Sequence, residues 1–388
     1  MLQPPAGSPM IRAAAVAPLV ADAADEIDRA QRFPERLMAA IRENALFRLL
    51  APHSICGEEA HPADYLDALR IVSRADGSVA WNMFVANSAV LIAPHMPLES
   101  AKTVFGPADG GAAWGPPDSQ TFLAVEGGYL VSGQWSFASG CRQATWMGAH
   151  AQVREPDGNL RLNSAGNPTT RSVLFPIEKA ERLDDWSPLG LRGTASESYR
   201  VKDVFVPEAF SATRETPEAR RDPGPLYAFP MQGLYAVGVA GVALGLAEAM
   251  LEAFERLARK KTPRGRPKLG ADPLVQFGYA KSLARLESAH ALLHRTLSEV
   301  HASAPDTGAL PIPERARVRL AATHAIMESI DVGDWVQKAA GVSAIFPGSP
   351  FERRFRDMHT LSQQIQSRDA HYQGVGQALL DQAPAGYY

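Results

Sequence analysis

The spacing of hydrophobic residues changes twice along the chain. From residue 12 to about residue 103, apolar positions recur every three or four residues, which indicates amphipathic helices. The segment PERLMAAIRENALFRLL places Pro34 in a first helical turn, and PADYLDALRIVSRA repeats the spacing through Tyr65, Leu69 and Val72. A third segment, VAWNMFVANSAVLI, is apolar on nearly all sides, so we expect it to be buried.

The period shortens to two residues between about 105 and 215. Short alternating segments, GGYLVSGQW, TWMGAHAQV, RSVLFPI and SYRVKDVFVP, are separated by turn residues. The first of them follows FLAVE across a turn at Gly127 and Gly128. Strands of this length and spacing predict a small antiparallel barrel or sandwich.

From about residue 230 the helical period returns and is longer. After Pro273, the positions of Leu286, Leu293 and Leu297 alternate as in the seam of a helix bundle, and a last helix is expected from near Pro350. The first helix of this region carries small residues that let a neighbour approach closely: Gly238, Gly241 and Gly245. The order predicts an α+β, mainly α, chain with a helical domain (12–104), a β-domain (105–220) and a helical bundle (221–388).

The amino-acid composition limits the classes of partner and the cell compartment that we expect for the chain. A formal charge of -3 with 21% charged residues gives no overall basic field, so we expect no nucleic-acid partner. Cys56 and Cys141 form neither a disulfide framework nor a CxxC pair, which favours the cytoplasm. No signal peptide is expected, and no run approaches the roughly 18 apolar residues of a membrane span, so we expect no membrane partner.

The common nucleotide, hydrolase and metal motifs are missing from the sequence. GVGQALL (374–380) lacks the third glycine and the preceding strand of a dinucleotide fingerprint. GxxxxGK[ST], HExxH and GxSxG do not occur, and we expect no metal site. His290 and His324 lie on apolar helix faces and are expected to be packed structural residues.

The segment GQWSFASG, residues 133–140, is the most unusual strand in the chain. Trp135, Phe137 and Ser139 occupy every second position, so in an extended chain all three share one face. Gly140 then lets the backbone pass close to another group.

This segment, together with WSPLGLRGTASESYRVKDVFVP (186–207) and FPGSPFERRFRDMHTLSQQIQ (346–366), resembles the acyl-CoA dehydrogenase superfold. More narrowly, the chain resembles the two-component flavin-dependent monooxygenases built on that fold, the group that contains p-hydroxyphenylacetate hydroxylase and dibenzothiophene monooxygenase. The resemblance covers nearly the whole chain from about residue 20. It implies an N-terminal helical domain, a central antiparallel β-barrel and a C-terminal four-helix bundle.

The resemblance also implies where flavin binds. Trp135 and Phe137 would wall the ring system, and Ser139 would offer its hydroxyl near flavin N5. An arginine of the tract PRGRPK would bind the flavin phosphate, often from a neighbouring subunit. The further flavin contacts that the resemblance implies are Trp114, Gly115, Trp186, Arg264, Arg266 and Ser343.

Within the superfold, the dehydrogenase branch needs a carboxylate base for the substrate α-proton. The corresponding position, nine residues after Arg356, is Ile365, and a second family location is Tyr235. Neither residue is a carboxylate, so dehydrogenation of a thioester is disfavoured.

The monooxygenase branch needs a dry site in which reduced flavin and O2 form a C4a-hydroperoxide. This branch usually has a histidine in its last helix, and Gln364 stands there instead. A glutamine can orient a group by hydrogen bonding but carries no proton at neutral pH. His371 is expected about 10 Å further along that helix. The residues expected to border the substrate are Ser88, Tyr235 and His371.

The sequence therefore predicts a monooxygenase that inserts one oxygen atom of O2 into a small aromatic or heteroaromatic substrate, indole-like or phenol-like. Its catalytic residues are Ser139 and Gln364. Its cofactor is FMNH2, or FADH2, supplied by a separate NAD(P)H:flavin reductase, and a cytoplasmic homotetramer is expected. The alternatives are an N-hydroxylase of an amine or amino sugar on the same fold, an acyl-CoA dehydrogenase-type flavoenzyme, and a non-catalytic helical binding protein.

Overall fold

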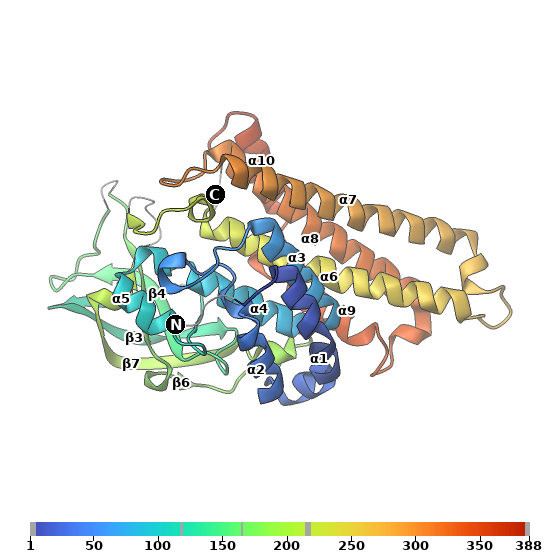
Figure 1. Cartoon of the computed structure of the whole chain (residues 1–388), viewed down its shortest axis with the longest axis horizontal. Coiled ribbons are helices and arrows are strands. Elements are labelled where there is room, and N and C mark those ends of the chain that lie inside the picture. The colour runs from blue at the N-terminus through green and yellow to red at the C-terminus, as the bar shows by residue number, and fades with distance from the viewer. Residues whose placement is uncertain (1–4, 117–118, 164–165, 214–218, 385–388) are drawn as a thin grey trace.

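The computed structural model describes residues 5–116, 119–163, 166–213 and 219–384. Helices α1 to α5 come first, strands β1 to β8 follow, and helices α6 to α10 complete the chain, in the order that the sequence predicted. The sheet lies at one end of the molecule, and the long helices α6, α7 and α8 extend away from it (Figure 1). The first helices pack beside both parts (Figure 1).

Helices α1 to α5 precede the sheet, and the apolar one among them, α4, packs on α3, on α6 and on β1. The bounds of these helices are α1 (Pro9–Ala30), α2 (Glu35–Glu43), α3 (Pro62–Ala75), α4 (Gly77–Val90) and α5 (Leu98–Phe105). Helix α4 is buried on nearly every side, as its composition predicted. Asp76 separates α3 from α4 and caps α4, because its carboxylate accepts a hydrogen bond from the amide of Val79 at 3.0 Å. Helix α2 is shorter than predicted, since Ala45 adopts a left-handed φ of 51°.

The strands form an open, mixed sheet. Their bounds are β1 (Ala112–Trp114), β2 (Thr121–Val125), β3 (Gly128–Ala138), β4 (Trp146–Arg154), β5 (Thr170–Pro176), β6 (Glu181–Arg182), β7 (Glu197–Pro207) and β8 (Ser211–Ala212). The strand order is β6-β7-β3-β2-β4-β5-β8, with β1 beside β4. Strands β1 and β2 run parallel to β4, and the other pairs are antiparallel.

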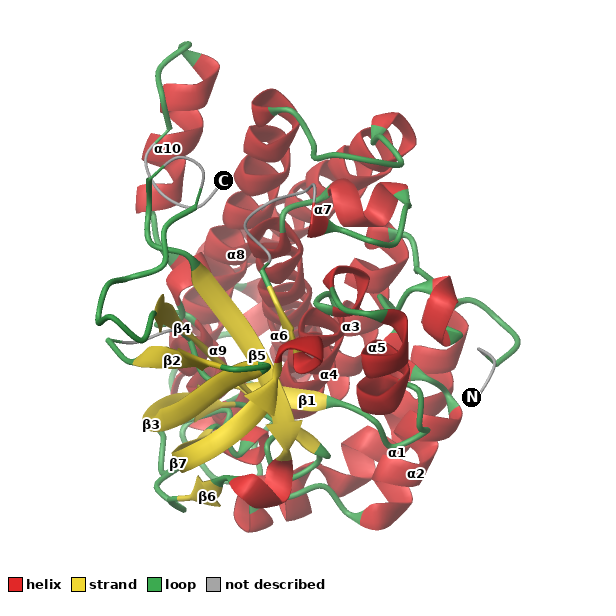
Figure 2. Ribbon diagram, turned by 90° about the vertical axis from the view of Figure 1, so that its left-hand side faces the viewer, coloured by secondary structure: helices red, strands yellow, loops and turns green. Residues whose placement is uncertain are grey.

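The closed antiparallel barrel that we predicted is therefore not the observed arrangement. Strands β6 and β8 end the path, and among the described strands they do not pair with each other. Each is only two residues long and follows a 3₁₀ turn, so neither edge offers a ladder long enough for closure. Figure 2 shows the strands gathered beside the helices.

The C-terminal helices are α6 (Met231–Lys260), α7 (Pro273–Ser303), α8 (Ile312–Ala340), α9 (Glu352–Leu361) and α10 (Ala370–Leu379). The glycine row of α6 packs as predicted. A Cβ atom on Gly245 would lie 2.3 Å from the carbonyl oxygen of Arg70, and one on Gly238 would lie 2.4 Å from the ring of Phe84. Helices α3 and α4 therefore approach α6 more closely than larger side chains would allow.

Two predictions about this region are wrong. The single last helix is instead α9 and α10, separated by a 3₁₀ turn at Ile365–Ser367. In addition, an 18-residue window of α6 reaches a mean hydropathy of 1.8, so this helix meets the length and composition test for a membrane span. Its small apolar residues were interpreted only as a packing surface. Because 89% of the window is buried inside the protein, the test is weak evidence for a span.

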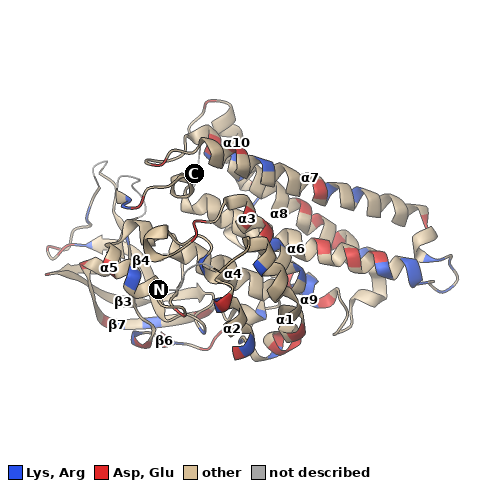
Figure 3. Cartoon of the chain, viewed as in Figure 1, with Lys and Arg blue, Asp and Glu red and all other residues tan. Residues whose placement is uncertain are grey.

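Charged side chains of both signs alternate along the long helices, and the turn between α6 and α7 is mainly basic (Figure 3). Burial divides the interior into a large helical core and a smaller core within the sheet. Trp135 belongs to the sheet core, whereas Trp81 of α4 belongs to the helical core. The end of β3 lies where these two cores meet.

Candidate active site

Strand β3 ends in a bulge that separates the three residues expected on one face. The register with β7 shifts between Trp135 and Ala138, and Phe137 has a left-handed φ of 64°. Trp135 is 1% exposed, whereas Phe137 is 62% exposed. The shared face that we predicted is wrong because a bulge inserts a residue and reverses the alternation.

Trp135 supports the strand from inside the sheet. Its ring stacks on Tyr199 with centroids 5.6 Å apart, and its indole N–H donates to the carbonyl of His150 at 3.2 Å. A direct contact between Trp135 and flavin stays a prediction.

Phe137 and Trp186, which are both expected to contact flavin, lie together. Their ring centroids are 6.3 Å apart in an edge-to-face arrangement, at the border between β3 and the loop that precedes β7. Leu189 in the same loop is 65% exposed. These side chains form an apolar surface beside the end of β3 that a planar ring system can cover.

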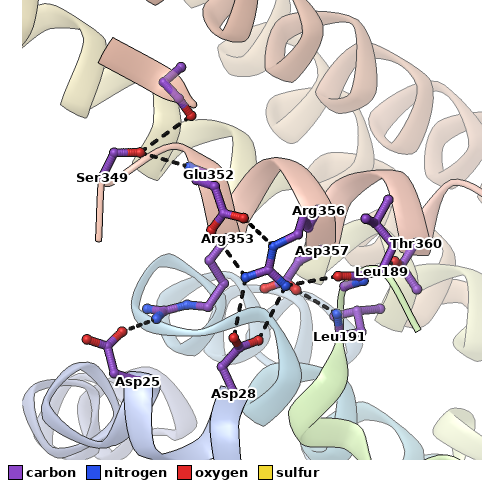
Figure 4. Close-up of polar contacts among 12 residues, drawn as sticks. Asp25, Asp28, Leu189, Leu191, Ser349, Glu352, Arg353, Arg356, Asp357 and Thr360 are labelled. Carbon is purple, nitrogen blue, oxygen red and sulfur yellow. Dashed lines mark hydrogen bonds and ion pairs between the residues drawn. The ribbon is translucent and has the colours of Figure 1, made fainter. Parts of the chain in front are cut away.

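Side chains of helix α9 hold the backbone of the loop that precedes β7 (Figure 4). Arg356 donates to the carbonyl of Leu189 at 2.9 Å, the amide of Gly190 donates to Thr360 at 2.9 Å, and the amide of Leu191 donates to Asp357 at 2.6 Å. The approach is so close that a Cβ atom on Gly190 would lie 2.2 Å from the backbone of Arg356. Three successive backbone groups are thus held by one helix.

Asp357 itself lies in an unusual environment. Burial raises the pKa of the Asp357 carboxyl, and the nearby charge of Asp76 raises it further, to about 7. The Leu191 amide and Arg353 act in the opposite direction. Burial likewise raises the pKa of Asp76, although Arg353 and the amide of Val79 oppose this shift.

Ser139 lies just after β3 and is 7% exposed. The indole N–H of Trp81 donates to its hydroxyl at 3.2 Å, and the hydroxyl of Ser196 is 2.5 Å away. Ser196 also contacts the hydroxyl of Thr194 at 2.7 Å, and Thr194 donates to the carbonyl of Leu191 at 2.7 Å. A chain of hydroxyl groups therefore runs from Ser139 to the loop held by α9.

Ser139 borders a cleft of about 50 Å³ between the N-terminal helices and the turn after β3. Much of the lining is apolar, with Met38, Ile41, Phe47, Val90 and Phe105. The amides of Asn82 and Gln143 also line it, and neither side chain has a hydrogen-bond partner for its nitrogen or its oxygen. Since a buried unpaired amide is unfavourable, these two groups are well suited to bind a polar ligand atom.

The turn that contains Trp114 and Gly115 lies directly against β3. A Cβ atom on Gly115 would lie 2.3 Å from the carbonyl oxygen of Ser136, so only glycine fits there. Trp114 is 7% exposed and packs edge-to-face on His150 at 4.8 Å.

Ser88 and Tyr235, expected at the substrate, both lie next to Phe84. Ser88 is 1% exposed and donates to the carbonyl of Phe84 at 3.0 Å. The ring of Tyr235 packs on Phe84 with centroids 4.5 Å apart. The structure thus brings the two residues to Phe84, Tyr235 on its ring and Ser88 on its backbone carbonyl within the same helix.

Gln364 and His371 do not share the helix that we predicted. Helix α9 ends at Leu361, where the hydroxyl of Ser367 donates to the Leu361 carbonyl at 3.0 Å. The side chain of Gln364 accepts a hydrogen bond from the amide of Gln366 at 2.6 Å, and His371 contacts the carbonyl of Ile365 at 2.8 Å. The expected 10 Å offset along one helix is therefore wrong, and a catalytic role of Gln364 stays a prediction.

The turns expected to contact flavin from a neighbouring subunit lie at the opposite end of the bundle from the sheet (Figure 1). Arg264 and Arg266 are exposed in the turn after α6, and Ser343 lies in the turn after α8. Lys261 donates to the carbonyl of Ala340 at 2.8 Å, which joins these two turns. Within one chain, Ser139 and these residues belong to separate regions.

Sequence reasoning missed Gln143, Thr194 and Ser196. The segment GTASES does show hydroxyl residues on alternate positions. Their link to Ser139, however, depends on the pairing of β3 with β7. Among the described residues, no group of three or more His, Cys, Asp or Glu side chains is placed to hold a metal ion.

The chain is similar in sequence to known flavin-related and monooxygenase proteins. The family model described as "Acyl-CoA dehydrogenase, C-terminal domain" matches residues 237–368. The chain is 28% identical to indole-3-acetate monooxygenase of Pseudomonas putida, over 94% of this chain and 91% of that protein. It is 27% identical to the oxygenase subunit HsaA, a flavin-dependent monooxygenase of Rhodococcus jostii, over 90% of this chain and 92% of that protein.

A solved structure shows the same fold. XiaF from a Streptomyces species, in complex with FADH2 and glycerol, superposes with a TM-score of 0.88 at 22% identity. The match covers 98% of this chain and 96% of that chain. The similarity therefore includes the helices before the sheet, the sheet and the long helices after it.

Proposed function

We infer that the chain is the oxygenase component of a two-component flavin-dependent monooxygenase with the acyl-CoA dehydrogenase fold. It is an oxidoreductase that uses reduced flavin to insert one oxygen atom of O2 into a small aromatic or heteroaromatic compound. The resemblance stated from the sequence is confirmed by relatives that match nearly the full chain. We propose the domain limits 12–104, 105–220 and 221–388 for the helical, β and bundle parts.

The observation that carries this function is the position of Ser139 at the cleft. Its hydroxyl borders a partly apolar space that also holds the unpaired amides of Asn82 and Gln143. A flavin has an apolar ring system with a polar edge, and Phe137 and Trp186 offer an apolar surface next to that hydroxyl. Ser139, Phe137 and Trp186 would hold a reduced flavin, FMNH2 or FADH2, with its ring on the apolar surface, because the cleft of about 50 Å³ is itself too small for the ring system. When bound, that cofactor supplies the electrons that activate O2.

Each side chain then has a separate task. Ser139 would accept a hydrogen bond from the N–H of reduced flavin N5, and Phe137 with Trp186 would exclude water from the ring. Trp114 and Gly115 close the other side of the site, with Trp135 behind the strand. Gln364 orients the reacting groups by hydrogen bonding, which needs no proton transfer by its side chain.

A partner subunit completes the flavin site in our proposal. The turns with Arg264, Arg266 and Ser343 lie far from Ser139 in one chain, and the end of the bundle that carries them exposes large apolar side chains beside its basic turn. These apolar side chains are Leu274 (80%), Phe277 (68%), Val342 (61%), Ile345 (60%) and Phe346 (58%). Apolar surface of this kind supports a homotetramer in which these turns reach the flavin phosphate of a neighbour.

The substrate we propose is indole-like or phenol-like and carries a polar group. The apolar lining of the cleft suits an aromatic ring, and Asn82 and Gln143 suit a polar substituent. The name of the Pseudomonas relative, an indole-3-acetate monooxygenase, supports an indole compound. Ser88, Tyr235 and His371 stay candidates for the border of the pocket. An N-hydroxylase has the same flavin site and differs only in its substrate.

The reduced flavin is supplied by a separate NAD(P)H:flavin reductase, as the oxygenase-subunit relative supports. We also propose a cytoplasmic location, which the two unpaired cysteines, Cys56 and Cys141, support.

Rapid mixing tests the function. Protein loaded anaerobically with FMNH2 or FADH2 is mixed with O2 and a panel of indoles and phenols, and flavin oxidation is followed together with product analysis. We expect at least one aromatic compound to gain one oxygen atom at the expense of one reduced flavin. Flavin oxidation that is the same with and without protein, with no oxygenated product, would overturn the proposal.

A further inference from the structure

The hydroxyl chain that ends at Ser139 has a direction that can be assigned by counting protons. A backbone carbonyl can only accept, so Thr194 must donate its one hydroxyl proton to Leu191. Ser196 must then donate to Thr194, and Ser139 must donate to Ser196. The hydroxyl proton of Ser139 is thereby used inside the protein.

The Ser139 hydroxyl has no proton left to donate, so toward a ligand it can only accept a hydrogen bond. A hydroxyl oxygen has two lone pairs, and the indole N–H of Trp81 occupies one of them. One lone pair is left for a ligand at the cleft. This lone pair can accept a hydrogen bond from a ligand N–H. It repels a ligand nitrogen that presents a lone pair instead.

Burial makes this direction difficult to reverse. Ser139 is 7% exposed, Ser196 is 5% exposed and Thr194 is 0% exposed, so water does not readily replace a lost partner. The Leu191 carbonyl at the end of the chain is itself held in place, because the amide of the same residue donates to Asp357. Reversal would remove the shortest hydrogen bond to that carbonyl, the one from the Thr194 hydroxyl at 2.7 Å, and leave it the amide of Thr194 at 3.1 Å and the indole N–H of Trp186 at 3.4 Å.

We propose that this hydroxyl chain selects the oxidation state of the flavin. Reduced flavin carries a hydrogen at N5, which the free lone pair of Ser139 accepts. Oxidised flavin has a lone pair at N5, which Ser139 cannot satisfy without reversal of the chain. Thr194 and Ser196 are therefore positioning residues that favour reduced over oxidised flavin without touching it. The inference rests on the proposed function, because it requires flavin N5 to face Ser139.

Such selection suits an oxygenase that receives reduced flavin and must release the oxidised form after each turnover. A site that bound reduced and oxidised flavin equally well would stay occupied by the oxidised flavin left after each turnover. The direction of one row of hydroxyl groups is enough to separate them, because the two forms differ at N5 in whether the nitrogen donates or accepts.

Anaerobic titration tests the proposal. The dissociation constants of FMN and of dithionite-reduced FMN are measured for the parent protein and for Thr194→Val, with FAD in parallel. Valine keeps the shape of threonine but cannot accept from Ser196, so Ser196 can turn to donate to Ser139. Ser139 then has a proton for oxidised N5. We expect the preference for reduced flavin to fall about tenfold, mainly because oxidised flavin binds more tightly.

Further variants separate this effect from damage to the fold. Ser196→Ala also frees the Ser139 proton and should give the same change if Thr194→Val does not fold. Thr194→Ser keeps the hydroxyl and should keep the parental ratio. Ser198→Ala is the matched control, since Ser198 lies two residues after Ser196 at the start of β7, is 6% exposed and donates to Ser136 at 3.0 Å outside the row of hydroxyl groups.

The outcomes are distinct. Tighter binding of oxidised flavin by Thr194→Val or Ser196→Ala supports the inference. Equal weakening of both forms, or an unchanged ratio, overturns it and leaves the monooxygenase function standing. Failure of the parent protein to bind reduced flavin at all would instead remove the proposed function. The midpoint potential of bound flavin gives a second readout, because a tenfold change in the ratio corresponds to about 30 mV.

Discussion

The sheet end of the molecule and the far end of the helix bundle differ in how much of the proposed flavin site a single chain supplies. At the sheet end, the hydroxyl chain from Ser139 to Leu191 is buried and every link has its partner within the chain. At the far end of the bundle, Arg264 lies in an exposed turn, and Phe277 and Phe346 are more than half exposed. In our proposal, one chain therefore supplies the redox end of the flavin site, whereas a second subunit supplies the phosphate end.

The largest effect is expected where α9 holds the loop at the sheet end. In Gly190→Ala, the new Cβ atom would lie 2.2 Å from the backbone of Arg356, so the loop must move away from α9. We expect a loss of several kcal/mol in the free energy of unfolding, measured by urea titration. Gly376→Ala is the control, because nothing lies within 4 Å of its added Cβ atom. Equal stability of the two variants would show that α9 does not constrain the loop.

A charge at the far end of the bundle should break the assembly and leave the fold intact. Phe277→Asp places a carboxylate on a side chain that is 68% exposed near the start of α7. We expect a smaller species by light scattering and at least tenfold weaker flavin binding, with an unchanged melting temperature. Leu380→Asp changes a residue that is 74% exposed after α10 and should leave both properties unchanged. Parental assembly and affinity in Phe277→Asp would contradict the shared site.

The buried carboxyls at the sheet end predict a pH dependence. The raised pKa of Asp357, about 7, means that the folded chain keeps a proton that the unfolded chain releases near pH 4. Stability should therefore fall as pH rises from about 4 to 7, by at most about 1.4 kcal/mol per pH unit for one proton. In Asp357→Asn, which can still accept from Leu191, this fall should shrink. Urea unfolding at several pH values measures it, and an unchanged slope in the variant would count against a protonated Asp357.

Removal of the Ser139 hydroxyl should uncouple the reaction. In Ser139→Ala, the hydrogen of reduced flavin N5 loses its acceptor, so we expect several-fold more hydrogen peroxide per reduced flavin consumed. Ser172→Ala, which changes another buried serine hydroxyl, one that contacts His150, is the comparison. Identical peroxide yields in Ser139→Ala and the parent protein would remove the assigned role.

The smallest effect is expected at Gln364. Its side chain caps a 3₁₀ turn, so Gln364→Ala should cost at most about 1 kcal/mol of stability. We expect oxygen transfer to slow a few-fold while flavin affinity stays constant, as measured by single-turnover product formation and titration. Unchanged transfer would place the orienting group elsewhere.

Local pattern determined much of this structure in advance. Helix α3 has the bounds 62–75 that its spacing and Pro62 predicted, and α4 is buried as its all-round apolarity required. The glycine row of α6 also predicted a close neighbour, which is α3. These features depend on residues that are close in the sequence.

The errors arose where distant segments decide the outcome. No local signal marks a left-handed Phe137, because the bulge exists only in the pairing of β3 with β7. The break after Leu361 depends partly on Ser367, which binds the Leu361 carbonyl from beyond the helix. The sheet stays open because its two edge strands are only two residues long. The cleft amides and the hydroxyl chain likewise join separate elements.

The central claim is that reduced flavin lies beside Ser139, and an anaerobic crystal soaked with dithionite-reduced FMN or FAD tests it most directly. The account predicts flavin N5 about 2.8–3.2 Å from the Ser139 hydroxyl oxygen, with Phe137 and Trp186 against the ring. Flavin bound elsewhere, or side chains filling the space next to Ser139 in the soaked crystal, would contradict it.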